Sequence, residues 1–214
     1  MSRFVRFLRC TGIAGLLVVG FGLWGAQSST AQVWVRTAHV SAPVTPEGVR
    51  PLLDTLAREK NLSVRQSPTD PGTMPISALR DTLMRTHGLD ITDANRVRVG
   101  YRFSVQGMEG FKWILTDLHF SYGGSPTTAN IPLLYLDPQT ERVQSMLRSA
   151  GPFSSSAFSE APASFREYLG MVNLLQLDGA EIVEIGGQSV TEGFDVQKRV
   201  LVQKVYRLTY LDTY

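Results

Sequence analysis

The stretch that decides the fold runs from residue 96 to residue 122 and reads RVRVGYRFSVQGMEGFKWILTDLHFSY. Apolar and polar residues alternate on both sides of Gly-Met-Glu-Gly, which is the pattern of a β-hairpin with one buried and one solvated face. We expect strands at residues 97–106 and 111–122, with Met108 and Glu109 as a two-residue turn.

This turn fixes a register in which Gly100 faces Asp117. Asp117 then lies diagonally between Arg98 and Arg102, within reach of both guanidinium groups. We interpret the three charges as a salt-bridge ladder on the solvated face, where each exposed pair contributes about 0–1 kcal/mol. The alternative is an anion site in which the two arginines bind a carboxylate or a phosphate.

The same register puts Trp113 opposite Ser104 and His119 opposite Arg98, on the polar face. An indole there does not fit plain solvation, and it suggests that the 151–164 loop or a partner covers part of this face. If the face binds a ligand, the candidate residues are Arg98, Arg102, Trp113, Asp117 and His119.

Two helices are expected before the hairpin. The first begins near Val49 or Arg50 with Pro51 in its first turn, and it carries one apolar stripe. The second follows Ser77 as its N-cap and stops at Gly88. A strand within residues 33–40 precedes both helices.

The chain after the hairpin is read as a mixture of strands and one helix. Residues 131–147 fit either a hairpin around Asp137-Pro138 or a strand followed by a helix, and we favour the hairpin because the first half ends at a turn signal. A third helix is expected over 164–178, and a long last strand over 196–211. The predicted class is α+β: a mostly antiparallel sheet with two N-terminal helices and one later helix packed on one face.

The N-terminus has the pattern of an export signal. Three arginines in the first nine residues precede an uncharged stretch, residues 10–26, and small residues follow up to Ala31. We predict a signal peptide over residues 1–31 and a single α+β domain over 32–214. The alternative is an uncleaved anchor, although 17 residues are at the short limit for a membrane-spanning helix.

Composition excludes several classes of function. The chain has 21 basic and 19 acidic residues, and residues 1–31 hold three arginines and no acid, so 18 basic and 19 acidic residues remain after them. The basic character thus belongs to the signal, and no nucleic-acid surface is expected. The single cysteine, Cys10, also lies in the signal, so we expect no disulfide, thiolate metal site or cysteine nucleophile in the domain.

No catalytic, metal or cofactor pattern stands out in the sequence. The histidines at 39, 87 and 119 do not have metal-ligand spacing. Asp117, His119 and Ser121 share one strand face but lie about 7 Å apart, too far for direct proton transfer. Glu181 and Glu184 are expected on opposite faces of one strand, so they are not an acid/base pair.

The sequence therefore indicates an exported, non-catalytic binding or assembly module of the cell envelope, periplasmic or extracellular. We expect an envelope protein as its partner, no nucleic acid, no cofactor, and contact with the membrane only through the N-terminal segment if that is uncleaved. The alternative is a small ligand carrier or enzyme that binds an anionic small molecule on the Arg98, Arg102 and Asp117 face.

Overall fold

The computed structural model describes residues 37–106, 110–123, 130–151, 153, 161–190 and 195–210, and every structural statement below concerns these residues. The predicted signal peptide lies outside them, as do the predicted turn residues and most of the 151–164 loop.

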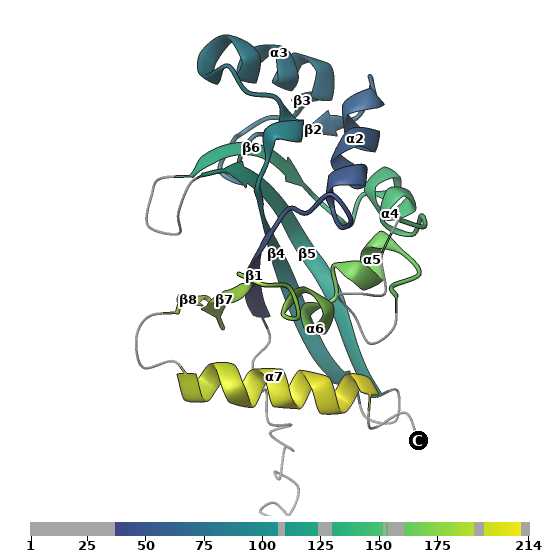
Figure 1. Cartoon of the computed structure of the whole chain (residues 1–214), viewed down its shortest axis with the longest axis vertical. Helices are drawn as coiled ribbons and strands as arrows, with labels where there is room; N and C mark the ends of the chain where they lie inside the picture. The colour runs from purple at the N-terminus through teal and green to yellow at the C-terminus, as the bar shows by residue number, and fades with distance from the viewer. Residues whose placement is uncertain are drawn as a thin grey trace, which may run out of the picture. The chain divides into compact units, whose positions relative to one another are not determined.

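The main sheet has six strands in the order β6-β5-β4-β1-β7-β8, and every neighbouring pair is antiparallel (Figure 1). Its strands are β1 (Thr37–Pro43), β4 (Arg96–Gln106), β5 (Gly110–Tyr122), β6 (Ile131–Leu136), β7 (Glu181–Ile185) and β8 (Gln188–Ser189). A separate two-stranded sheet consists of β2 (Ser63–Val64) and β3 (Met74–Pro75). The predicted α+β class is confirmed.

The helices gather before and after the long hairpin. They are α2 (Arg50–Arg58), α3 (Ile76–His87), the 3-10 turn η1 (Ile91–Asp93), α4 (Glu141–Leu147), α5 (Phe165–Tyr168), α6 (Met171–Leu174) and α7 (Asp195–Tyr210). None of the helices in the described part of the chain combines the length and apolarity needed to cross a membrane.

Both predicted N-terminal helices are confirmed. Pro51 lies in the first turn of α2, where its missing N–H costs no helical hydrogen bond. Gly88 ends α3 with φ 68°, a left-handed conformation that favours glycine. Ser77 is not the cap, however, because α3 already begins at Ile76 after the extended residue Pro75.

The hairpin predicted over residues 131–147 is wrong, since β6 is followed by α4. Asp137 accepts a hydrogen bond from the Gln139 backbone N–H (2.8 Å), and this turn leads into the helix. The buried residues of α4 are Val143, Met146 and Leu147, whose spacing follows the helical period rather than strand alternation.

The long last strand is also wrong, since residues 195–210 form the helix α7. The many valines raise the strand propensity of this segment, but tertiary packing overrides propensity. Among the α7 side chains whose burial is described, the buried ones are Leu201 and Val205, which are four residues apart and 2% and 3% exposed. This is the spacing of one helix face.

The third predicted helix is divided into α5 and α6 at Gly170. Its backbone is extended there (φ −60°, ψ 138°), and a Cβ would lie 2.9 Å from the Glu167 carbonyl oxygen. The indole of Trp113 packs against the same position, 3.6 Å from where that Cβ would be. One predicted later helix is therefore replaced by α4, α5, α6 and α7.

The core lies between one face of the sheet and helices α2, α4, α5 and α6 (Figure 1). Alternate residues of the strands supply the sheet side of this core: Ala38, Val40, Ala42, Val97, Val99, Tyr101, Phe103, Leu118, Phe120, Leu134 and Leu136. The buried Tyr101 hydroxyl donates a 2.6 Å hydrogen bond to the Leu169 carbonyl oxygen, which ties β4 to the segment between α5 and α6. The opposite face of the sheet is polar.

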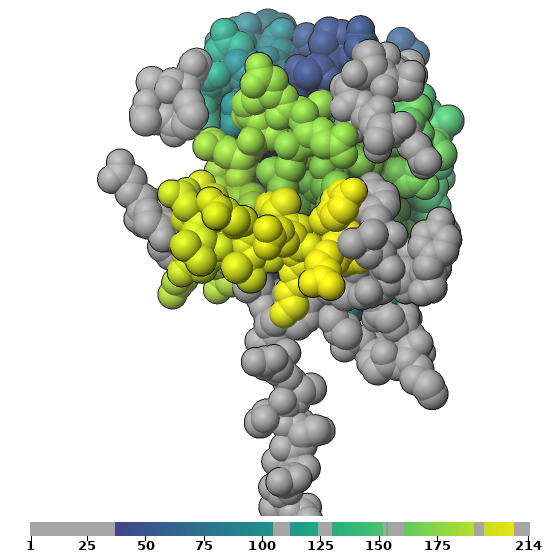
Figure 2. All heavy atoms as spheres, turned by 60° about the horizontal axis from the view of Figure 1, so that its bottom comes forward, coloured from purple at the N-terminus to yellow at the C-terminus, as the bar shows by residue number. Residues whose placement is uncertain are grey.

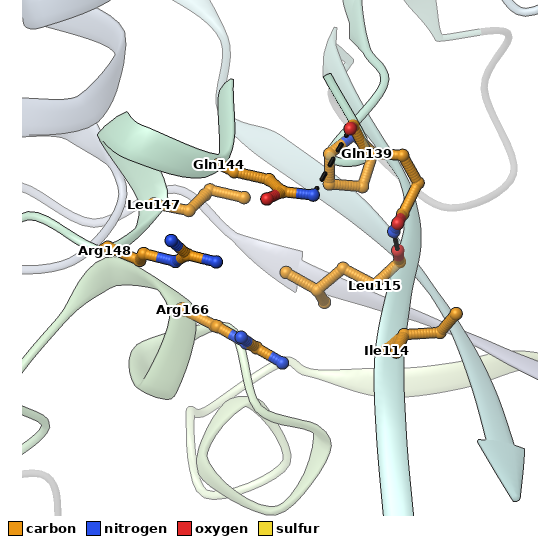
Figure 3. Close-up of a pocket in the computed structure, with 8 residues that line it drawn as sticks. Ile114, Leu115, Gln139, Gln144, Leu147, Arg148 and Arg166 are labelled. Atoms are coloured by element: carbon orange, nitrogen blue, oxygen red, sulfur yellow. Dashed lines mark hydrogen bonds between the residues drawn. The ribbon is translucent and has the colours of Figure 1, made fainter. Parts of the chain in front are cut away.

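The long hairpin follows the predicted register only in part. Its pairs match the prediction as far as Gly100 opposite Asp117, but Tyr101 then faces Leu115, so that Thr116 is an extra residue in β5. Such a β-bulge shifts every later pair by one and exchanges the two faces of the bulged strand. The side-chain amide of Gln139 donates to the Leu115 carbonyl oxygen at this point (2.6 Å; Figure 3).

The Tyr101 hydrogen bond gives a test of the core. Replacing Tyr101 with Phe leaves the Leu169 carbonyl without this donor, so we expect the free energy of unfolding to fall by about 1–2 kcal/mol. The measurement is urea denaturation followed by circular dichroism. Tyr122→Phe is the control, since Tyr122 is 42% exposed, and an equal loss in both variants would contradict the argument.

Candidate functional site

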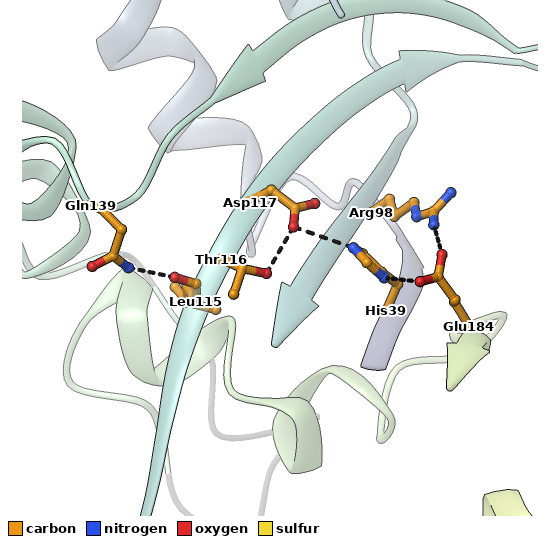
Figure 4. Close-up of polar contacts among 7 residues, drawn as sticks. All are labelled: His39, Arg98, Leu115, Thr116, Asp117, Gln139 and Glu184. Atoms are coloured by element: carbon orange, nitrogen blue, oxygen red, sulfur yellow. Dashed lines mark hydrogen bonds and ion pairs between the residues drawn. The ribbon is translucent and has the colours of Figure 1, made fainter. Parts of the chain in front are cut away.

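Four strands contribute to one row of residues across the polar face of the sheet. Glu184 of β7 faces His39 of β1, His39 faces Gly100 of β4, and Gly100 faces Asp117 of β5. A Cβ on Gly100 would clash with the carboxylate of Asp117 and the hydroxyl of Thr116. Because β4 has no side chain at this position, Asp117 reaches across it to His39 (Figure 4).

His39 therefore lies between two carboxylates. Its Nε2 donates to Asp117 Oδ2 (3.2 Å), and its Nδ1 is 3.3 Å from Glu184 Oε1, an ion-pair distance without hydrogen-bond geometry. Glu184 in turn accepts from Arg98 Nη2 (2.5 Å). We call His39, Arg98, Asp117 and Glu184 the His39 cluster.

The environment of Asp117 favours its charged form. Burial alone would raise its pKa, but hydrogen bonds from His39 and Thr116, together with the electrostatic influence of His39 and Arg98, outweigh that effect, so the pKa is lowered. The Thr116 hydroxyl donates to the same oxygen as His39 does, at 2.8 Å. The extra residue of the bulge thus helps to hold Asp117 as a carboxylate.

His119 lies in the next row, between Arg98 of β4 and Tyr135 of β6. Burial lowers its pKa, the charge of Arg98 lowers it further, and Asp117 opposes both. Its buried Nε2 has no hydrogen-bond partner among the described residues. These conditions favour a neutral imidazole.

A second bulge, in β7, brings both acidic residues of that strand to the polar face. Glu184 faces His39 while Ile182 faces Val40, so Val183 is the extra residue. Glu181 then points to the same side as Glu184 and lies 3.5 Å from Arg96 Nη2. The prediction that the two glutamates lie on opposite faces of the strand is wrong.

The structure brings together three of the five predicted ligand-binding residues. Arg98, Asp117 and His119 are neighbours on the polar face. Arg102 lies on the same face opposite Thr37, exposed and without an ion pair in the described part of the chain. The predicted ladder does not form, because Asp117 turns to the imidazole of β1.

Trp113 is not on the polar face, contrary to the prediction. The bulge shifts it opposite Phe103, on the core side, with its ring 6.3 Å from that of Tyr101. The guanidinium of Arg166 lies over the indole, 5.6 Å from the ring centre. The indole is thus shielded from solvent in part by α5 and by the backbone at Gly170, whereas most of the 151–164 loop, which the sequence had suggested as its cover, lies outside the described residues.

Sequence reasoning missed His39 and Glu184. Both stand at alternate positions of short strands, which is a signal for the solvated face, but nothing in the sequence says that β1 pairs with both β4 and β7.

The polar contacts of the His39 cluster hold strands of the sheet together. Both ring nitrogens face carboxylates, so no described hydroxyl is placed to be activated by the imidazole. Within the described ranges, no group of three or more His, Cys, Asp or Glu side chains could hold a metal ion. The cluster instead joins β7, β1, β4 and β5 through side chains that are about one-fifth exposed, apart from Arg98.

A small open pocket of about 160 Å³ lies beside the bulge, at the edge of β5 that β6 no longer covers (Figure 3). It is lined by Ile114 and Leu115 of β5, Pro138 and Gln139 of the following turn, Gln144, Leu147 and Arg148 at the end of α4, and Arg166 of α5. The lining contains two guanidinium groups and no carboxylate.

Comparison with known proteins places the chain in no group: no family model, no curated protein and no solved structure matches it.

The gap at Gly100 predicts a large effect of a small substitution. Gly100→Ala must displace Asp117 or Thr116, so we expect unfolding to become easier by about 1–3 kcal/mol, the usual cost of overpacking. The measurement is chemical denaturation. Gly72→Ala is the matched control, because a Cβ at Gly72 meets nothing within 4 Å; equal effects of the two substitutions would show that the gap is unimportant.

The lowered pKa of Asp117 predicts a dependence of stability on pH. Because the folded pKa lies below the unfolded one, the carboxylate stabilises the fold above the unfolded pKa, and this contribution is lost as the pH falls through the folded pKa. We expect Asp117→Asn to cost about 1–2 kcal/mol near neutral pH, and less in acid, where the wild type loses the same charge.

The measurement is the difference in unfolding free energy between Asp117→Asn and the wild type, followed from neutral pH down to about pH 3. Asp54→Asn, exposed on α2, controls for the general loss of one negative charge. A difference that stays constant over this range would contradict the role assigned to the carboxylate.

Proposed function

We propose that the chain is an exported, non-catalytic binding domain of the cell envelope. In place of the envelope protein expected from the sequence, we propose that it binds an anionic membrane surface through the outward face of α7. Export is proposed from the N-terminal sequence pattern. Binding rather than catalysis is supported by the His39 cluster, whose titratable groups are directed at one another.

The outward face of α7 is the observation that carries the proposal. The helix packs on α6 and β5 through the side of Leu201 and Val205, and the other side is open. Val196 and Val200, one turn apart on that open side, are 70% and 55% exposed. Figure 2 shows α7 lying across the surface of the described part of the molecule.

The charge of α7 indicates what this face binds. The helix carries Lys198, Arg199, Lys204 and Arg207 against the single acid Asp195, whereas residues 32–214 as a whole are nearly balanced. Exposed apolar side chains flanked by Lys and Arg are typical of helices that lie on anionic lipid surfaces.

The position of the first residue of β1 also supports an anionic membrane surface as the binding partner. β1 starts at Thr37, at the end of the sheet that α7 crosses (Figure 1). The apolar stretch at residues 10–26 precedes this point in the sequence. If that stretch is retained as an anchor, the described part of the chain follows it from Thr37 onward.

The alternative, an anionic ligand on the Arg98, Arg102 and Asp117 face, has less support. Arg98 is already engaged by Glu184, and the negative charge of Asp117 adjoins it. An anion at this place would have to displace a carboxylate that is held in the sheet.

A fluorescent reporter on α7 tests membrane binding whether or not the N-terminal segment is cleaved. Val200→Cys, in a Cys10→Ser background, is labelled with an environment-sensitive dye and mixed with vesicles. We expect a blue shift with phosphatidylglycerol vesicles, little shift with phosphatidylcholine, and a weaker response at high salt because the charges are screened.

The matched control is Met84→Cys on α3, because Met84 is also 55% exposed. Its dye should not respond to either vesicle. Equal shifts at both positions, or no shift at residue 200, would overturn the proposal. Exchange of Arg199 and Arg207 for Gln should weaken the response at residue 200.

A further inference from the structure

The pocket beside the bulge has two guanidinium groups and no carboxylate in its lining. Four arginines elsewhere in the described part of the chain are paired with carboxylates: Arg80 with Asp90, Arg96 with Glu181, Arg98 with Glu184 and Arg142 with Glu59. Arg148 and Arg166 form no ion pair in the part of the chain that the structure describes, although both line the same pocket.

The acidic residue closest in sequence to Arg166 is engaged elsewhere. Glu167 accepts a hydrogen bond from the Ala163 backbone N–H (2.7 Å), which closes the first turn of α5 together with the Ser164 cap. Its carboxylate is therefore held at the start of α5 by the backbone.

The guanidinium of Arg166 is partly preorganised. It lies over the indole of Trp113, and stacking on an aromatic ring restricts the side chain while leaving its N–H donors available to a ligand. A ligand that binds a restricted donor loses less entropy than one that must order a free side chain. Arg148, at the end of α4, points into the same space (Figure 3).

The remaining walls of the pocket are apolar or neutral. Ile114, Leu115 and Leu147 supply aliphatic surface, and the Gln139 amide is used by the Leu115 carbonyl. Two guanidinium groups select an anion, and the aliphatic walls favour one with an apolar portion. A volume of about 160 Å³ restricts the ligand to a small molecule.

We propose that this pocket binds a small organic carboxylate, with the carboxylate between Arg148 and Arg166 and the apolar portion against Leu115 and Leu147. No residue of α7 lines this pocket, so the proposal stands independently of membrane binding. It also differs from the Arg98 and Arg102 face, where the sequence alone had suggested an anion.

Isothermal titration calorimetry of the purified full chain with benzoate tests the proposal. We expect binding with a Kd of about 1 mM or tighter. Arg148→Gln and Arg166→Gln should each weaken it about tenfold or more, which corresponds to the loss of one charge-assisted contact. Benzamide, which has the same shape without the charge, should bind at least about tenfold more weakly than benzoate.

Arg142→Gln is the matched control, because it removes one positive charge from the same helix, α4, outside the pocket. It should change the affinity by less than about twofold. Unchanged melting curves of the two pocket variants would show that they remain folded. Benzoate binding that survives the double replacement, or no binding at all, would overturn the proposal, and so would benzamide or inorganic phosphate binding as tightly as benzoate.

Discussion

The structure depends on the absence of a side chain at Gly100, which faces Asp117 next to the extra residue Thr116. On the polar side, this gap lets Asp117 cross β4 and meet His39, so that strands which are not neighbours are joined by side chains. On the core side, the inserted residue turns Trp113 inward. One backbone irregularity therefore determines what both faces of the hairpin present.

The consequences of the bulge extend to the helices. On the core side the indole of Trp113 packs beside Gly170, and that same glycine divides the predicted third helix into α5 and α6. The indole then supports the guanidinium of Arg166, and the Leu115 carbonyl is satisfied by Gln139 instead of by β6. The pocket is thus built from groups that a regular hairpin would have placed elsewhere.

The sequence predicts the register of the hairpin correctly from Val97 to Gly100, but not beyond the bulge at Thr116. Alternation is regular from Arg96 to Gly100, but Ile114 and Leu115 are adjacent apolar residues, and this break in the alternation is the one local sign of a bulge. The polar positions of Arg98 and Asp117 were predictable, whereas their partners depend on strand neighbours that a sequence does not specify. In α7, valines with strand propensity were outweighed by the helical spacing of Leu201 and Val205.

The surfaces of the described part of the chain differ in whether their charged side chains are paired with an opposite charge. In the His39 cluster every group is matched, and matched charges at this degree of burial hold strands together at little net gain or cost. Elsewhere, Arg148 and Arg166 line one pocket without an ion pair among the described residues, and α7 carries four basic residues and one acidic residue. These two places are the ones for which we propose a function in binding. The two places differ in shape, a recess and a helix face, and this difference is why we assign a small carboxylate to one and a lipid surface to the other.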